Sequence, residues 1–214
     1  MTNRKFKDET LAIRSQSKQT LHGEHSVPLF LTSSYAFDSA DEMAAAFNGS
    51  IDANVYSRYS NPNVEELVKK FCLLENAPAG IATATGMAAV FSTFAAILNS
   101  GDHIIASRAL FGSAIQILSN ILPRWGVTCT YVDPVDVDSW QKSITSNTKI
   151  IFFETPSNPS LWITSLEKAN EVAKANNLLL IVDNCFATPI IQKPMLFGAD
   201  LIIHSTTKYA DGHG

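Results

Sequence analysis

The sequence has few cysteines, few charged residues and no long apolar run. Only 3 of its 214 residues are cysteines, and they lack the paired spacing of a disulfide framework. Charged residues make up 17% and the formal net charge is −4, which gives no electrostatic footprint for nucleic acid. No apolar run approaches the roughly 18 residues of a membrane span, and no signal-peptide core follows the first residues. We therefore expect a cytoplasmic protein with reduced cysteines that binds neither nucleic acid nor membranes.

Nucleotide and metal signatures are also missing. Neither a Gly-x-Gly-x-x-Gly nor a Walker pattern is present, which disfavours a Rossmann-like oxidoreductase or a nucleoside triphosphatase. The segment His22-Gly23-Glu24-His25 lacks further ligands at the spacing of a zinc site, so no metal is assigned. The remaining composition, with 46% hydrophobic residues and no low-complexity segment, is typical of a globular enzyme.

A regular alternation of strand-like and helical patterns begins near residue 63. Residues 1–62 lack sustained periodicity and are predicted to form an N-terminal arm, and residues 63–214 a larger α/β domain. Strands are predicted at 80–84, 103–106, 127–132, 150–153, 178–182 and 201–204, and helices at 64–74, 87–98, between Gly112 and Pro123, and at 164–173. The last helix is predicted to start with a capping box formed by Thr164 and Glu167. This rhythm predicts a mostly parallel sheet between helices.

Two charged residues follow apolar runs near the end of the chain. Asp183 directly follows the run 178–182, and Lys208 follows the run 199–203, so a carboxylate and an amine are expected at equivalent positions on two parallel strands. The carboxyl ends of parallel strands form the ligand crevice of an open α/β sheet. An amine in such a low-dielectric site can form a Schiff base with an aldehyde, and an aspartate beside a pyridine nitrogen keeps that nitrogen protonated. Taken singly, Asp183 is better read as a cap or turn residue and Lys208 as a surface lysine.

Taken together, the segments 181–184 (Ile-Val-Asp-Asn) and 204–209 (His-Ser-Thr-Thr-Lys-Tyr) resemble the signature of the Cys/Met-metabolism pyridoxal phosphate enzymes. That family includes cystathionine γ-synthase, methionine γ-lyase and the O-acylhomoserine sulfhydrylases. The resemblance runs from about Pro28 to Gly214. It implies a type I pyridoxal phosphate-dependent transferase fold, like that of aspartate aminotransferase, with pyridoxal 5'-phosphate as cofactor. Lys208 would carry the cofactor, and Asp183 would hold its ring nitrogen.

The resemblance also implies a phosphate-binding group. The turn 83–88 contains Gly86 and Met87, whose backbone amides would bind the phosphate together with the hydroxyls of Ser205 and Thr207. Glycine permits close backbone approach, and the N–H groups at a helix start attract phosphate. Without the resemblance this turn is a weak signal, since any strand-to-helix turn can carry a glycine.

Two further residues are expected at the cofactor ring. Phe111 stands where the family usually has a tyrosine that stacks on the ring, and Asn158 would donate to its phenolate oxygen. Core packing and an ordinary Asn-Pro turn are the simpler alternatives. Ser113 replaces the cysteine of γ-lyases, which disfavours a methionine γ-lyase. The role of Glu154 is left open as a structural cap or a salt-bridge partner.

The segment 56–63 resembles an arm motif that reaches into a neighbouring subunit. Tyr56 and Arg58 would contact the neighbour's cofactor phosphate, and Tyr56 is also a candidate catalytic residue. The planar fork of an arginine suits two phosphate oxygens. A homotetramer with active sites shared between subunits follows from the resemblance, whereas a solvated loop with scattered aromatics is the alternative.

The function implied is γ-replacement on an activated homoserine in methionine biosynthesis, using O-succinylhomoserine or O-acetylhomoserine and sulfide to give homocysteine. Cysteine as the thiol would instead make a cystathionine γ-synthase of the transsulfuration route. A γ-lyase and an inactive cofactor-binding fragment are further alternatives. The resembled enzymes continue through an antiparallel strand, which inserts between the strand preceding Gly86 and the strand preceding Lys208, and through a C-terminal domain with the arginine for the substrate carboxylate. We therefore expect these residues to be part of a longer polypeptide, or the rest to exist as a separate chain or segment.

Overall fold

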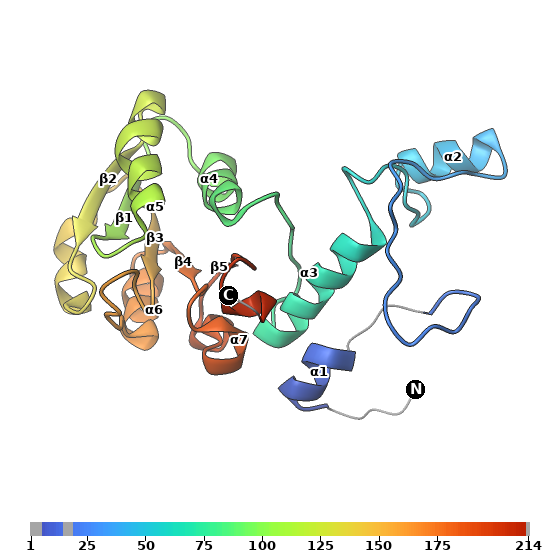
Figure 1. Ribbon diagram of the computed structural model, residues 1–214. Coiled ribbons are helices and arrows are strands. Elements are labelled where there is room, and N and C mark those ends of the chain that lie inside the picture. The colour runs from blue at the N-terminus through green and yellow to red at the C-terminus, as the bar shows by residue number, and fades with distance from the viewer. Residues whose placement is uncertain (1–5, 15–18, 213–214) are drawn as a thin grey trace. The chain divides into compact units, whose positions relative to one another are not determined.

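The computed structural model describes residues 6–14 and 19–212 (Figure 1). The chain divides into two compact units, Met1–Ala82 and Thr83–Gly214. The predicted arm, residues 1–62, ends inside the first unit, and its boundary stays a prediction.

The first unit contains three helices, α1 (Asp8–Arg14), α2 (Ala40–Phe47) and α3 (Pro62–Glu75). The arm therefore includes two short helices, and neither buries a residue. Helix α3 confirms the predicted helix 64–74. It starts at the cap Asn61, whose side chain accepts a hydrogen bond from the Asn63 N–H, and ends at Asn76 in the left-handed conformation.

The second unit is built on a five-stranded parallel sheet in the order β2-β1-β3-β4-β5. The strands are β1 (His103–Ser107), β2 (Thr128–Val132), β3 (Thr148–Glu154), β4 (Leu179–Asp183) and β5 (Leu201–Ile203). The predicted parallel sheet and five of its predicted strands are confirmed. Isoleucine and phenylalanine form the middle of β3, and leucine, isoleucine and valine form most of β4, as expected of strands buried on both faces.

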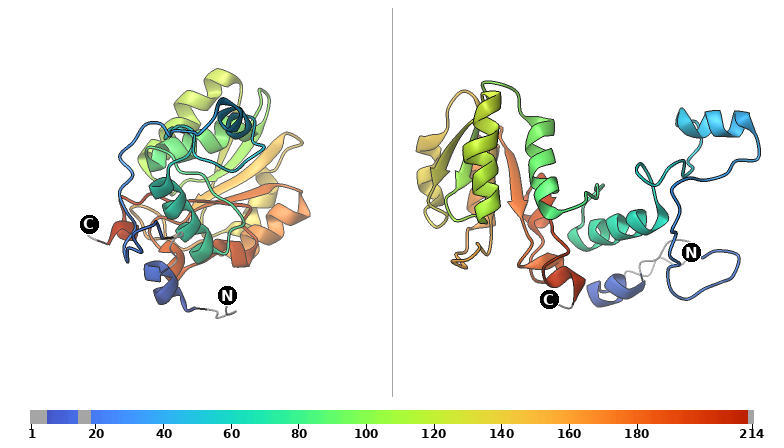
Figure 2. Two further views of the ribbon diagram at one scale, coloured as in Figure 1. Left: turned by 90° about the vertical axis from the view of Figure 1, so that its right-hand side faces the viewer. Right: turned by 45° about the horizontal axis from the view of Figure 1, so that its top comes forward.

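Helices cover both faces of this sheet (Figure 2). Helices α4 (Gly86–Ile97) and α5 (Gly112–Gln116) bury Phe94 and Ala114 against one face. Helix α6 (Leu166–Ala175) and the 3-10 segment Val137–Ser143 bury Ala169 and Trp140 against the other. The remaining helical segments are Ile117–Ile121 (π), Leu122–Trp125 (3-10), α7 (Thr188–Ile191), Pro194–Phe197 (3-10) and Tyr209–Asp211 (3-10).

Two local predictions were wrong. Residues 80–84 form no strand, and Ile81 is 92% exposed. A strand needs a ladder partner, and no described strand pairs with this stretch or with the outer edge of β5. Helix α6 is capped by Ser165 rather than Thr164, because the Ser165 hydroxyl accepts the Lys168 N–H at 3.3 Å, while the Thr164 N–H donates to Thr155. The predicted helix between Gly112 and Pro123 is present, but its middle turn is wound as a π-helix.

Among the described helices, none combines the length and the apolar character needed to cross a bilayer.

Candidate active site

Two carboxylates end neighbouring strands at the carboxyl edge of the sheet. Asp183, the last residue of β4, is the register partner of Glu154 in β3 and of Ile203 in β5. The Asp183 Oδ1 accepts the Cys185 N–H at 3.0 Å. Burial raises the pKa of Asp183, and the hydrogen bonds from Cys185 and the charges of His204 and Lys208 oppose that rise. Asp183 is therefore a partly desolvated carboxylate that favours a cationic neighbour.

Lys208 lies close to this edge, but it does not end a strand. It follows β5 by five residues and closes a turn in which its N–H donates to the Ser205 carbonyl at 3.3 Å. The expectation that the amine and the Asp183 carboxylate occupy equivalent strand ends is therefore wrong, because β5 stops at Ile203. The Lys208 Nζ lies 6.0 Å from the centroid of the Phe111 ring, within the range of a cation–π contact.

The backbone of Phe111 is held at the carboxyl end of β1 by a hydrogen bond to β3, the neighbouring strand in the sheet. Its backbone N–H donates to the Glu154 Oε2 at 2.9 Å, and its ring is 41% exposed. Plain core packing, the alternative weighed for Phe111, does not fit that exposure. The ring instead presents a face at the same edge as Lys208.

Glu154 is a buried acid whose pKa departs from the ordinary range. Burial, followed by the charge of Asp183, raises its pKa to about 7 from an ordinary 4.5, while the backbone N–H groups of Asn158 and Phe111 and the charge of Lys208 act in the opposite direction. Asn158 therefore lies in the same neighbourhood as this carboxyl group.

The start of helix α4 approaches Ser205 closely. A Cβ atom built on Gly86 would lie 2.6 Å from the Ser205 Cβ, so only glycine fits there. The Thr85 hydroxyl caps the Ala88 N–H, which leaves the N–H groups of Gly86 and Met87 among those that a helix cannot satisfy internally. Thr207 lies in the turn between Ser205 and Lys208. The Ser205 side chain thus lies beside backbone donors at the start of α4, and such donors attract anions.

The two arm residues belong to the first unit. The Arg58 guanidinium lies over two tyrosine rings, 5.1 Å from the centroid of Tyr56 and 5.2 Å from that of Tyr59. The two rings meet edge to face at 6.5 Å. The approach of Tyr56 and Arg58 to a neighbouring subunit stays a prediction.

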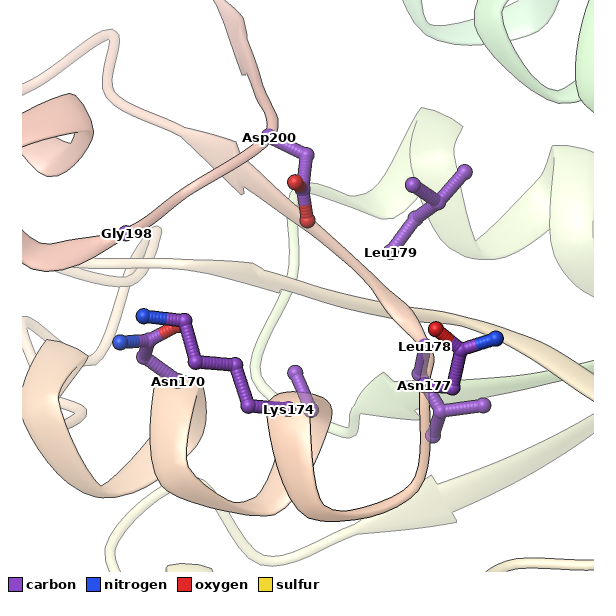
Figure 3. Close-up of a pocket in the computed structure, with 8 residues that line it drawn as sticks. Asn170, Lys174, Asn177, Leu178, Leu179, Gly198 and Asp200 are labelled. Carbon is purple, nitrogen blue, oxygen red and sulfur yellow. The ribbon is translucent and has the colours of Figure 1, made fainter.

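A cavity of about 240 Å³ lies at the other end of β4 (Figure 3). Leu179 starts β4 and lines this cavity, whereas Asp183 ends the strand. The Asp200 carboxylate in its wall accepts the Leu180 N–H at 2.8 Å. The cavity is therefore separate from the site described above. Across the described residues, no group of three or more His, Cys, Asp or Glu is placed to hold a metal ion.

The sequence matches the family of Cys/Met metabolism PLP-dependent enzymes over residues 9–214, where PLP is pyridoxal 5'-phosphate. The chain belongs to this family. The match extends the resemblance toward the N-terminus beyond Pro28.

Known relatives of the chain in this family carry two activities. The chain is 43% identical to an O-succinylhomoserine sulfhydrylase of Pseudomonas aeruginosa over 96% of its own length and 51% of the relative's. It is 38% identical to an L-methionine γ-lyase of Fusobacterium nucleatum subsp. polymorphum, covering 100% of this chain and 54% of that one. The chain spans about half the length of the curated relatives it matches.

Solved structures of PLP enzymes have the same fold. A Campylobacter jejuni protein described as an O-acetylhomoserine (thiol)-lyase superimposes with a TM-score of 0.92 at 37% identity, covering 98% of this chain and 52% of the other. That structure contains N'-pyridoxyl-lysine-5'-monophosphate, a lysine that carries the cofactor. The α/β fold expected from the resemblance is thereby confirmed.

The residues of this PLP-family chain fit the cofactor's chemistry. The close approach of Gly86 to Ser205 leaves room only for backbone and small polar groups, which suits a phosphate. The exposed face of Phe111 suits an aromatic ring, and the desolvated carboxylate of Asp183 suits a protonated pyridine nitrogen. Which atoms these residues contact in the holoenzyme stays a prediction.

The sequence reasoning did not assign a site role to two residues. The role of Glu154 was left open, and Cys185 was expected only as one of three reduced cysteines. The Cys185 Sγ accepts the Ser205 N–H at 2.9 Å and Cys185 also bonds to Asp183, so it ties the turn after β5 to the end of β4. The position of both residues was the available signal: Glu154 ends a buried strand, and Cys185 lies two residues after Asp183, which ends the neighbouring strand.

Proposed function

We propose that the protein carrying this chain catalyses PLP-dependent γ-replacement on an activated homoserine. O-Succinylhomoserine or O-acetylhomoserine would react with sulfide to give homocysteine, in methionine biosynthesis. The observation that carries the proposal is the placement of the Lys208 amine beside the Phe111 ring, with its charge acting on the Asp183 carboxylate. The 43% identity to an O-succinylhomoserine sulfhydrylase supports the substrate class.

The roles follow from the chemistry of the side chains. Lys208 would hold the cofactor and then move protons at Cα and Cβ of the substrate. Asp183 would hold the proton on the pyridine nitrogen. When bound, the cofactor supplies an electron sink for the carbon acid, which makes those protons removable. Phe111 would stack on the ring, and Asn158 would donate to its phenolate oxygen.

A tyrosine at position 111 could carry a proton to the acyl group that leaves from Cγ. In this chain another residue must do so. Phe111 keeps the stacking face but has no hydroxyl, so it cannot carry a proton to the departing acyl group. Tyr56 is the phenol of the arm motif and is the proposed catalytic partner. Because it would come from a neighbouring subunit, we propose a cytoplasmic homotetramer with shared sites, in which Arg58 also contacts the neighbour's phosphate.

Methionine γ-lyase is the second candidate, supported by the 38% identity to the Fusobacterium enzyme. Ser113 disfavours a γ-lyase, because γ-lyases resembling this chain carry a cysteine at that position. A cystathionine γ-synthase would use nearly the same residues with cysteine as the thiol.

The deciding experiment offers both acylhomoserines to the protein as its gene encodes it, with sulfide or with cysteine, and offers methionine alone in parallel. Homocysteine formed from sulfide is expected. Cystathionine as the main product identifies the synthase, and methanethiol from methionine identifies the lyase. A visible cofactor band without turnover on any of these substrates supports a binding module instead.

A further inference from the structure

Glu154 links the end of β3 to the loop that follows β1. It ends β3, is 3% exposed, and accepts the Phe111 N–H, which lies 43 residues earlier in the loop after β1. One buried carboxylate therefore holds the backbone of Phe111, a residue that is proposed to stack on the cofactor ring.

Burial of the Glu154 carboxylate lowers the stability of the fold. A carboxylate loses hydration on burial, and the loss is balanced only where N–H donors and positive charge replace the water. Here the neighbouring strand contributes Asp183, a like charge, and the turn after β5 contributes Lys208, an opposite one. A neutral side chain would fill the position without this conflict, so packing alone does not explain a glutamate there.

We propose that Glu154 is a positioning residue for the cofactor ring: it fixes the loop after β1 to the end of β3, and so sets the Phe111 face relative to Lys208. The proposal rests on the proposed function for the identity of the ring. The link between Phe111 and Glu154 is a property of this chain and is testable without the cofactor.

The first measurement is amide hydrogen exchange at Phe111 in the cofactor-free protein, as its gene encodes it. Glu154→Ala removes the acceptor of the Phe111 N–H, and we expect exchange at this amide to accelerate roughly 10-fold or more, since it loses a buried bond. Glu154→Gln keeps one acceptor oxygen and is expected to be intermediate. Unchanged exchange at Phe111 in Glu154→Ala overturns the link.

The second measurement is the visible circular dichroism of bound pyridoxal phosphate, which reports the orientation of the ring in its asymmetric site. We expect a weaker or altered band in Glu154→Ala and partial rescue in Glu154→Gln. Faster exchange with an unchanged band and unchanged cofactor affinity overturns the positioning role. If Glu154→Ala does not fold, the same two criteria apply to Glu154→Gln.

Thr148→Val is the matched control on the same strand. The Thr148 Oγ1 bonds to the His103 Nδ1 at 2.8 Å at the opposite end of β3. The control is expected to lower stability and to leave exchange at Phe111 and the circular dichroism unchanged. Altered exchange at Phe111 in this variant overturns the proposal, because any damage to β3 then has the same effect. Failure of the wild type to bind pyridoxal phosphate overturns the proposed function and the cofactor role of Glu154, while the exchange result still decides the link between Phe111 and Glu154.

Discussion

Glu154 and Asp183 are register partners on the neighbouring parallel strands β3 and β4. Two acids side by side at the buried end of a sheet cannot both ionise freely, and the pKa of each is raised, in the first place by burial. Hydrogen bonds give them different partners. Glu154 accepts from the backbone of Phe111, whereas Asp183 accepts from Cys185. We propose that the two carboxylates have separate tasks, Glu154 in holding the loop after β1 and Asp183 in facing the cofactor.

The first prediction concerns Lys208. We expect Lys208→Ala to abolish both the covalent bond to the cofactor and turnover, because the Lys208 amine is the one that lies beside the Phe111 ring and acts on the Asp183 carboxyl in the described residues. Absorbance spectra of the protein with added cofactor check this. The matched control is Lys174→Ala, at the cavity near the start of β4, which is expected to keep the cofactor absorbance. A bound-cofactor spectrum that survives in Lys208→Ala refutes the assignment.

The second prediction concerns Asp183. In Asp183→Asn the neutral partner no longer favours a protonated pyridine nitrogen, so removal of the substrate Cα proton should slow by roughly 10²- to 10³-fold. Exchange of that proton with solvent, followed by NMR, measures the step directly. Asp200→Asn serves as control, because Asp200 bonds to the Leu180 N–H at the far end of β4. Wild-type exchange rates in Asp183→Asn would contradict the electron-sink role.

The third prediction uses two glycines that each start a helix. Gly86→Ala puts a Cβ 2.6 Å from that of Ser205, which costs about 1–3 kcal/mol of overpacking strain and should weaken cofactor binding at least ~10-fold. Gly112 also begins a helix, but a Cβ there meets nothing within 4 Å. Gly112→Ala should therefore leave affinity close to that of the wild type. Equal affinities of the two variants, measured by equilibrium dialysis, argue against a phosphate site at Gly86.

The fourth prediction tests the shared site. Arg58→Ala removes one charge-assisted contact and should weaken cofactor retention roughly 10- to 100-fold. Mixing Arg58→Ala with Lys208→Ala subunits should restore part of the activity, since a hybrid pairs one intact arm with one intact lysine. Verified mixed oligomers without any restored activity would show that the arm does not complete a neighbour's site.

The fifth prediction follows from the pKa of Glu154, raised from 4.5 to about 7. An acid that holds its proton more tightly in the folded state adds stability below about pH 4.5, and this contribution is lost as the pH rises through about 7. Glu154→Gln cannot lose a proton, so its free energy of unfolding should fall less across this window. The wild type and Glu154→Gln should differ in this loss of unfolding free energy by on the order of 3 kcal/mol at most, because the neighbouring Asp183 also acts on the Glu154 carboxyl. Urea unfolding of the cofactor-free proteins at several pH values measures it, and parallel profiles would be inconsistent with a raised pKa.

Much of the second unit was predictable because local patterns set it. The apolar runs around Ile151 and Ile181 are buried on both faces, and the segment 87–98 carries one apolar side, so β3, β4 and α4 follow from periodicity. The stretch 80–84 has the same apolar character. It forms no strand, because pairing depends on a partner that local sequence does not specify.

Most of the residues of the candidate site could be named from the sequence. Their arrangement in space could not. The position of Lys208 past the end of β5 depends on where that strand stops pairing with β4. The bond from Phe111 to Glu154 joins residues 43 apart in the chain, and no periodicity encodes such a contact. The cap of α6 shows the same limit at short range: Thr164 and Ser165 are both good caps, and tertiary contacts of Thr155 decide between them.

The most direct test of the account is to locate the cofactor on the chain. The protein is incubated with pyridoxal phosphate, reduced with borohydride to fix any cofactor–lysine bond, digested, and mapped by mass spectrometry. The account predicts a single modified peptide, with the pyridoxyl phosphate group on Lys208. Modification at another lysine, or an unmodified Lys208 in protein shown to be folded, would contradict it.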